Sequence, residues 1–297
     1  MNKNARKLFA SVTPSALINF DYPDPSRVLG LSLSHYSGVV DWVKAKEAGI
    51  KFAYIKAFNG VNNSVRFWAD NYAGAVKEGI LVGAYSWLYP PSVASPGTQA
   101  RKFAEYLKGY PTQLPPCMDF EWTYPSNPNA GDLWGWVSPF EAETGSKPAI
   151  YTAPGYWNQY GSIAFVWADY PLWQAQYDNG HADIINPWTG YEFLQWTEKG
   201  KGTDYGVPIT GERACELNYY VGTLDELNAK YGGGVVSPPD NGEITMTTYQ
   251  MTTISSGTRI RSDHSTFATV LLSVGANVTV QGDELWTATV DGSEVKA

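Results

Sequence analysis

The residues of this chain best suited to acid–base chemistry are two carboxylic acids, Asp119 and Glu121, on either side of Phe120. In a β-strand, residues two apart face the same side and lie roughly 6.6 Å apart, at ~3.3 Å per residue. Two acids beside apolar neighbours are costly to bury as charges, so one of them tends to keep its proton. Glycoside hydrolysis uses such a pair as proton donor and stabiliser. By itself the pattern also fits an exposed pair or a structural ion pair.

The elements that must position this pair alternate between strand-like and helix-like segments from residue 28 to 231. The spacing of apolar residues predicts helices over 40–48, 67–78, 98–107, 133–143 and 224–230. Short apolar runs predict eight strands, over 28–33, 52–57, 81–87, 118–121, 149–152, 172–176, 193–196 and 215–219. Repeated strand–helix units of this size favour an α/β fold, an irregular TIM-like (β/α) barrel of parallel strands. The stretch 173–217 shows little helical periodicity, so we expect the C-terminal part of the barrel to be helix-poor.

Polar residues at strand ends are the other candidates, because a parallel barrel carries its reactive groups there. The first and last strands are neighbours in a closed barrel. We therefore expect Ser32 and Ser34 from the first strand to meet Glu216 and Asn218 from the last strand. The chain also holds 12 Trp and 20 Tyr, whose flat faces stack well on sugar rings.

The composition excludes several other classes. The chain of 297 residues has 21 Lys and Arg against 29 Asp and Glu, a net charge of −8 that disfavours nucleic-acid partners. No apolar run is long enough for membrane insertion, and no cofactor motif or G-x-S-x-G sequence is present. The three histidines, His35, His181 and His264, lack metal-ligand spacing, so we expect no metal and no cofactor. Strand alternation places Cys117 inward and Cys215 outward, which predicts two free thiols.

Residues outside the barrel form three further segments. Residues 1–27 are predicted to be an irregular N-terminal arm whose apolar stretch is too short for a secretory signal. We expect the protein to stay in the host cytoplasm until lysis and then to act on the cell wall. Residues 28–232 form the predicted barrel, and the Gly- and Pro-rich run 233–242 is a predicted linker. Residues 243–297 are rich in Thr and Val, which predicts a small β module. The oligomeric state does not follow from the sequence.

Nine segments in chain order resemble the glycoside hydrolase family 25 lysozymes, which are N-acetylmuramidases with an irregular barrel that include phage endolysins. The segments are GLSLSHYSG (30–38), IKFAYIKAFNG (50–60), FWADNYAGAVKEGILVGAYSW (67–87), GTQARKFAEYL (97–107), LPPCMDFEW (114–122), KPAIYT (147–152), PLWQAQY (171–177), FLQW (193–196) and ELNYYVG (216–222). The resemblance implies hydrolysis of the β-1,4 bond between N-acetylmuramic acid and N-acetylglucosamine in bacterial peptidoglycan.

The resemblance also implies roles for individual residues. Glu121 would be the general acid, and Asp119 would orient the substrate's 2-acetamido group, which acts as an internal nucleophile. The resemblance places a third acid, Glu216, at the catalytic site. The remaining implied residues line the sugar cleft: Ser32, Tyr85, Trp87, Trp122, Tyr151, Trp196 and Asn218.

The sequence departs from the family pattern at three positions. Ser32 replaces the first-strand Asp, Glu216 replaces the last-strand Asp, and Asn59 replaces a Glu. One hypothesis is that Glu216, longer by one methylene, reaches in and restores the missing negative charge. The alternative is a weakened or non-catalytic protein that binds cell-wall glycan.

One alternative enzyme class and one further resemblance, that of the C-terminal tail, complete the interpretation of the sequence. A chitinase-like glycosidase is the nearest other enzyme, but its D-x-x-D-x-D-x-E run is absent, since residues 114–117 read LPPC. The module over 243–297 resembles bacterial SH3-like wall-binding domains. Such a module would raise the effective concentration of the enzyme on an insoluble substrate.

Overall fold

The computed structural model describes residues 24, 26–61, 65–177, 182–208 and 215–233, and the backbone of five short strands between residues 258 and 296. The chain divides into two compact units, Met1–Pro239 and Asp240–Ala297. The first unit contains the strands and helices that the sequence predicts for a barrel. Among the described residues no helix is long and apolar enough to cross a membrane.

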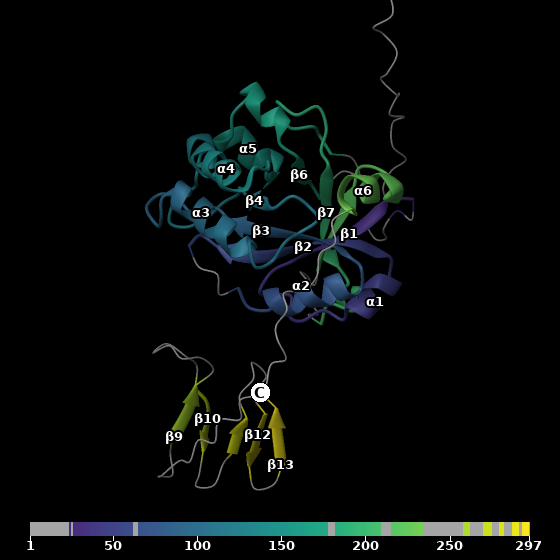
Figure 1. Ribbon diagram of the computed structural model, residues 1–297, viewed down its shortest axis with the longest axis vertical. Helices are drawn as coiled ribbons and strands as arrows, with labels where there is room; N and C mark the ends of the chain where they lie inside the picture. Colours follow the sequence, from purple (N-terminus) through teal and green to yellow (C-terminus); the bar gives the residue numbers. More distant parts are fainter. Residues whose placement is uncertain are drawn as a thin grey trace, which may run out of the picture. The chain divides into compact units, whose positions relative to one another are not determined.

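Eight strands of the first unit close into a barrel (Figure 1). Each strand pairs with the next along the chain, and the last pairs with the first. The predicted α/β barrel is thereby confirmed. The strands are β1 (Val28–Leu33), β2 (Ile50–Asn59), β3 (Leu81–Trp87), β4 (Cys117–Asp119), β5 (Ala149–Thr152), β6 (Leu172–Ala175), β7 (Phe193–Gly200) and β8 (Cys215–Tyr220).

Strand β8 corrects the prediction of an all-parallel sheet, because it runs antiparallel to both β7 and β1. Parallel pairing needs a long crossover, usually an α-helix. The described part of the β7–β8 connection holds only the short 3₁₀ helix η2 (Gly202–Tyr205). Since β8 is reversed, its first residues lie at the rim where β1 to β7 end, and Glu216 pairs in register with Ser32.

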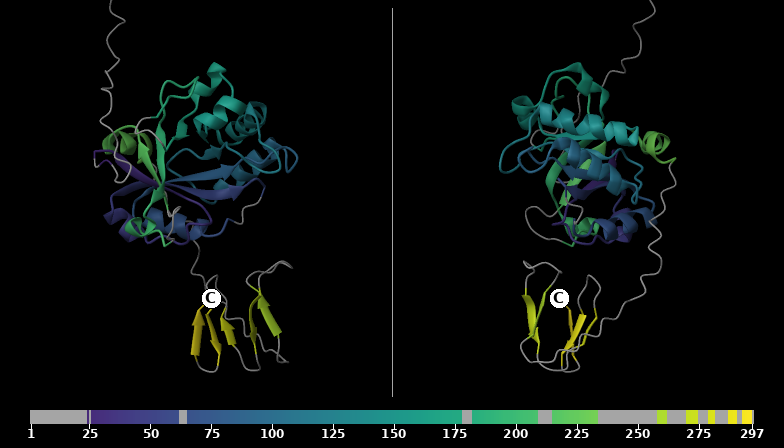
Figure 2. Two further views of the ribbon diagram at one scale, coloured as in Figure 1. Left: turned by 180° about the vertical axis from the view of Figure 1, so that it is seen from behind. Right: turned by 60° about the vertical axis from the view of Figure 1, so that its left-hand side comes forward.

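The described helices lie outside the barrel, with α1 and α2 on one side and α4 and α5 on the opposite side (Figures 1 and 2). Helix α4 illustrates why they form here. Its N-cap residue is Asn129, whose side chain accepts from the first turn while Asp132 accepts a hydrogen bond in return, and its C-cap residue is Gly145, with φ 69°. The helices are α1 (Trp42–Glu47), α2 (Trp68–Lys77), α3 (Pro96–Leu107), α4 (Ala130–Thr144), α5 (Pro154–Tyr160), the 3₁₀ helix η1 (Phe165–Asp169) and α6 (Leu224–Tyr231).

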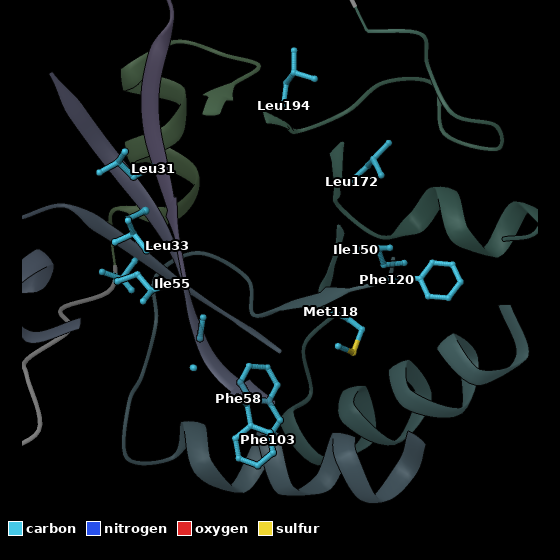
Figure 3. Packing of buried hydrophobic residues seen from close by; sticks show 14 of the residues in the cluster. Leu31, Leu33, Ile55, Phe58, Phe103, Met118, Phe120, Ile150, Leu172 and Leu194 are labelled. Atoms are coloured by element: carbon cyan, nitrogen blue, oxygen red, sulfur yellow. The ribbon is translucent and has the colours of Figure 1, made fainter. Parts of the chain in front are cut away.

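Alternation along the strands creates an apolar layer outside the barrel. Outward side chains such as Leu31, Met118 and Ile150 belong to one buried cluster, which also contains residues of the helices (Figure 3). Phe58 at the end of β2 meets Phe103 of α3, with 5.7 Å between ring centroids. This layer holds the helices against the sheet.

A second apolar layer fills the inside of the barrel. Tyr54 stacks on Trp173, with 4.4 Å between ring centroids, and meets Phe193 edge-on at 5.3 Å. Glycine makes room for these rings, because a Cβ at Gly83 would lie 2.3 Å from the Tyr54 ring and one at Gly30 would lie 2.4 Å from a neighbouring ring. The inside is therefore a packed core, and polar side chains gather above it.

The second unit carries five described strands, which pair antiparallel in two small sheets. One sheet contains two strands and the other three. This is a β structure, as predicted for residues 243–297. Most of the predicted N-terminal arm and linker lies outside the described residues. The strands are β9 (Thr258–Arg261), β10 (Val270–Val274), β11 (Thr279–Gln281), β12 (Thr287–Val290) and β13 (Ser293–Lys296).

Candidate active site

The carboxyl pair lies at the C-terminal end of β4, where the backbone is held on both sides. Leu88 N donates to Asp119 O at 3.1 Å, and Phe120 N donates to Tyr151 O at 2.9 Å. Phe120 points outward into the helix-facing cluster. Strand alternation therefore turns Asp119 toward the barrel axis, where it is only 4% exposed. Glu121 lies two residues beyond the end of β4, close enough to Glu216 and Lys56 for their charges to act on it.

Burial changes the proton affinity of both acids. Desolvation raises the pKa of Asp119 well above its usual value, and the nearby Glu121 raises it further. Desolvation also raises the pKa of Glu121 to about 7, and the charge of Glu216 acts in the same direction. The Lys56 ammonium opposes both shifts. Both acids therefore hold their protons to a higher pH than exposed carboxyl groups do.

Glu216 reaches across from β8 to the first strand. Ser32 Oγ donates to Glu216 Oε2 at 2.8 Å, and Gln195 Nε2 donates to the same oxygen at 3.1 Å. Gln195 and Asn218 both donate to Ser32 Oγ, at 3.0 Å and 3.1 Å. The structure thus brings Ser32, Glu216 and Asn218 together as predicted. The Glu216 carboxyl group, one methylene longer than the Asp of the family pattern, lies beside the Ser32 hydroxyl.

Aromatic side chains lie near the acids on β3, on β5 and in the segment that follows β4. Tyr85 and Tyr151 are buried inside the barrel, and burial raises the pKa of each phenol well above its usual value. Trp87 lies under the Lys56 ammonium. Trp122 is 50% exposed and meets Tyr156 edge-on, with 5.0 Å between ring centroids. These side chains offer both a buried wall and an exposed rim.

Two predicted residues lie elsewhere. Trp196 does not line the cleft, because it points out of the barrel, is 2% exposed and stacks on Tyr219 with 5.1 Å between ring centroids. Trp196 directly follows the inward Gln195 along β7, so it faces the opposite side of the strand. Ser34 lies beyond β1, where its hydroxyl accepts from Tyr36 N and its own N–H donates to Ser37 Oγ. It thus shapes a turn rather than joining Ser32.

Sequence reasoning overlooked several polar residues of the site. Lys56, Gln195 and Tyr177 lie in segments that match the family pattern, yet their types gave no direct signal. Their inward direction follows from alternation: Lys56 is two residues beyond the inward Tyr54, and Gln195 is two beyond the inward Phe193. Counting residues from the packed core would have found them.

Cys117 belongs to the inner cluster and Cys215 to the outer one, and both are free thiols as predicted. Among the described residues no group of three His, Cys, Asp or Glu side chains could hold a metal ion.

Residues 31–205 match glycosyl hydrolases family 25. This segment is more than half of the chain and includes Ser32, Asp119 and Glu121. A closed barrel with two inward acids at the end of β4 accompanies the match. The chain therefore belongs to glycosyl hydrolases family 25, a family of glycoside hydrolases.

Among its relatives, the chain is 32% identical over 195 residues to Lysozyme M1 of Streptomyces globisporus. That match covers 60% of this chain and 64% of the relative, so the chain spans slightly less than two thirds of Lysozyme M1. It is 27% identical over 220 residues to YegX of Escherichia coli K12, which covers 71% of this chain and 76% of YegX.

Solved structures show the same fold. A muramidase from Acremonium alcalophilum matches with a TM-score of 0.58 at 26% identity, over 70% of this chain and all of the other. A bacterial lysozyme from Streptomyces coelicolor matches with a TM-score of 0.58 at 25% identity, over 70% of this chain and 98% of the other.

Proposed function

We propose that this chain is a muramidase, which cleaves the β-1,4 bond between N-acetylmuramic acid and N-acetylglucosamine in bacterial peptidoglycan. One observation carries the proposal: Asp119 Oδ1 is buried and accepts no hydrogen bond from any described residue. A buried carboxyl oxygen without a donor is costly. The site is therefore suited to a ligand that brings its own N–H group, and a 2-acetamido sugar does so.

Glu121 acts as the general acid in this proposal. With a pKa of about 7 it holds a proton near neutral pH and gives it to the glycosidic oxygen. The carbonyl oxygen of the 2-acetamido group attacks the anomeric carbon as the bond to the leaving oxygen breaks. The Glu121 carboxylate then takes a proton from water, whose oxygen attacks the same carbon and opens the cyclic intermediate.

Asp119 assists the nucleophile. Its Oδ1 accepts a hydrogen bond from the acetamido N–H, which orients the group and stabilises the positive charge that develops on it. A donor at this oxygen favours the charged form of Asp119 and so offsets part of the pKa rise due to burial. Substrate binding thus prepares the carboxylate that the reaction uses.

The cleft binds the sugars through aromatic faces and polar groups. Trp122 offers half its surface at the rim, and Trp87, Tyr85 and Tyr151 form the wall beside the acids. The names of similar proteins, Lysozyme M1 and the muramidase of Acremonium alcalophilum, support the same substrate class.

Mass spectrometry of digested peptidoglycan tests the proposal. Purified protein is expected to release fragments with muramic acid at the reducing end. Glu121→Gln should abolish release while the variant stays folded, and the exposed Glu143→Gln should behave as wild type. Glucosamine reducing ends would mean that a different bond is cleaved. Binding to cell walls without any new reducing end would mean a non-catalytic glycan-binding protein.

A further inference from the structure

A chain of hydrogen bonds connects β6, β7, β8 and β1 beside the carboxyl pair, and its direction is fixed at one end by an indole. Trp173 Nε1 donates to Asn218 Oδ1 at 2.8 Å. Because an indole N–H can only donate, the amide of Asn218 must turn its Nδ2 toward Ser32. Ser32 Oγ accepts this bond, and its own proton goes to Glu216 Oε2.

Gln195 fixes the same network from the other side. Its Oε1 accepts hydrogen bonds from the hydroxyls of Tyr151, at 2.8 Å, and Tyr177. Its Nε2 then faces Ser32 Oγ and Glu216 Oε2 and donates to both. The opposite orientation would turn an amide oxygen toward a carboxylate with no proton between them. All four bonds of this amide are used, and the residue is 2% exposed.

Glu216 therefore receives two donated hydrogen bonds at one oxygen, from Ser32 and from Gln195. Donors of this kind favour the charged form of a carboxyl group. The structure thus holds the Glu216 side chain beside the carboxyl pair through two uncharged donors, Ser32 and Gln195.

We propose that Gln195 is a positioning residue of the active site: together with Ser32 it holds the Glu216 carboxylate in one orientation beside the general acid. From there the charge of Glu216 adds to the effect of desolvation, which is the larger cause of the raised pKa of Glu121. The proposal deepens the function proposed above and rests on it for the role of Glu121 as the general acid. Tyr151 and Tyr177 belong to the same network, since their hydroxyls set the orientation of the Gln195 amide.

Other charged and titratable groups also act on Glu121 and Glu216. Lys56 of β2 lowers the pKa of Glu121, and the pKa of Asp119, at the end of β4, is raised in turn by the charge of Glu121. The buried phenols have raised pKa values and stay neutral near pH 7, so they donate hydrogen bonds without adding charge. The phenols that sense Glu121 or Glu216 are Tyr85, Tyr151, Tyr156 and Tyr177.

Carboxyl-carbon NMR titration of full-length protein tests the proposal without relying on activity. The Glu121 signal is identified by its loss in Glu121→Gln. In Glu216→Gln, which keeps the shape of the side chain, the apparent pKa of Glu121 should fall by about one unit. In Gln195→Leu it should fall by a smaller amount, because Glu216 loses a donor. The double variant should show no greater fall than Glu216→Gln alone.

Gln174 provides a matched control, since it is a fully buried glutamine on the outward face of β6. Gln174→Leu should lower stability yet leave the pKa of Glu121 in place. An unmoved pKa in Glu216→Gln would overturn the proposal, as would shifts of Gln195→Leu and Glu216→Gln that add in full. The first comparison uses only the isosteric variant Glu216→Gln, so it stays decisive even if Gln195→Leu fails to fold.

A transplanted charge gives an independent comparison. Ser32 and Glu216 pair in register, so Ser32→Asp combined with Glu216→Gln moves the carboxylate from β8 to β1. This variant should show a higher Glu121 pKa than Ser32→Asn combined with Glu216→Gln, which has the same shape without the charge. Equal values would overturn the charge argument. A wild-type chain with no activity on peptidoglycan would instead remove the proposed function and leave the titration result standing.

Discussion

The ammonium group of Lys56 lies 4.4 Å from the centroid of the Trp87 ring, so neighbouring strands β2 and β3 hold a cation over an indole face. Lys56 is only 5% exposed. Burial lowers its pKa, while Asp119, Glu121 and Glu216 act in the opposite direction. The acids thus offset part of the effect of burial on the pKa of Lys56, and its ammonium in turn lowers the pKa values of Asp119 and Glu121.

Lys56→Met should therefore impair the reaction at neutral pH. Without the ammonium, the pKa values of Asp119 and Glu121 rise further, and Asp119 loses the ionised form that accepts the acetamido N–H. We expect the release of reducing ends at pH 7 to fall about tenfold or more, or ~1.4 kcal/mol in barrier. Lys77→Met, at an exposed position of α2, is the matched control. A rate within twofold of wild type would contradict the role of Lys56.

The pH dependence of activity should follow the proton on Glu121. Its pKa of about 7 means that the acid form is lost as the pH rises through 7. We expect kcat/KM on soluble glycan fragments to fall with increasing pH above about 7 and to approach a tenfold loss per pH unit. A profile measured between pH 5 and 9 checks this, and an equal rate at pH 6 and pH 9 would exclude Glu121 as the acid.

The free energy of unfolding should decrease with rising pH because of Glu121. The pKa of Glu121 is raised on folding, so the native state binds its proton more tightly than the unfolded chain. Its contribution is fully present below the unfolded pKa of 4.5 and is lost as the pH rises through about 7. Glu121→Gln should therefore raise the melting temperature more at pH 8 than at pH 4, corresponding to about 1–2 kcal/mol. An equal effect at both pH values would contradict the raised pKa.

The barrel could be predicted because each strand is a short apolar run between helices with clear periodicity. Strand direction at β8 could not, since residues 201–214 carry no sign of which way the chain returns. Glu216 nonetheless lies beside Ser32. The reversed strand β8 starts at the rim where β1 ends, so the first residues of β8 pair with the last residues of β1.

Some residues of the site could be predicted from the sequence, and others could not. Asp119 and Glu121 were visible as a pair of acids two residues apart. The prediction that Trp196 lines the sugar cleft was wrong. It was based on residue type, whereas Trp196 directly follows the inward Gln195 and therefore points outward. Lys56 and Gln195 were missed because a lysine and a glutamine in apolar strands gain their meaning from the buried acids that they face.

Removal of residues 240–297 should separate catalysis from wall binding. The first compact unit contains the whole barrel and both acids. We expect a chain ending at Pro239 to retain activity on soluble glycan fragments and to lose affinity for intact walls in a sedimentation assay. Unchanged wall binding would mean that the tail is not a wall-binding module.

Trp122 at the rim and Trp196 in the outer layer should respond differently to replacement by alanine. Trp122 is half exposed at the rim, so Trp122→Ala should raise KM for soluble glycan about fivefold, leave kcat nearly unchanged, and cost less than about 1 kcal/mol of stability. Trp196 fills the outer layer against Tyr219, and Trp196→Ala should cost about 3–5 kcal/mol of unfolding free energy. The folded fraction of that variant should keep the wild-type KM. Thermal unfolding and steady-state kinetics on both variants check this, and a raised KM with unchanged stability in Trp196→Ala would return that residue to the cleft.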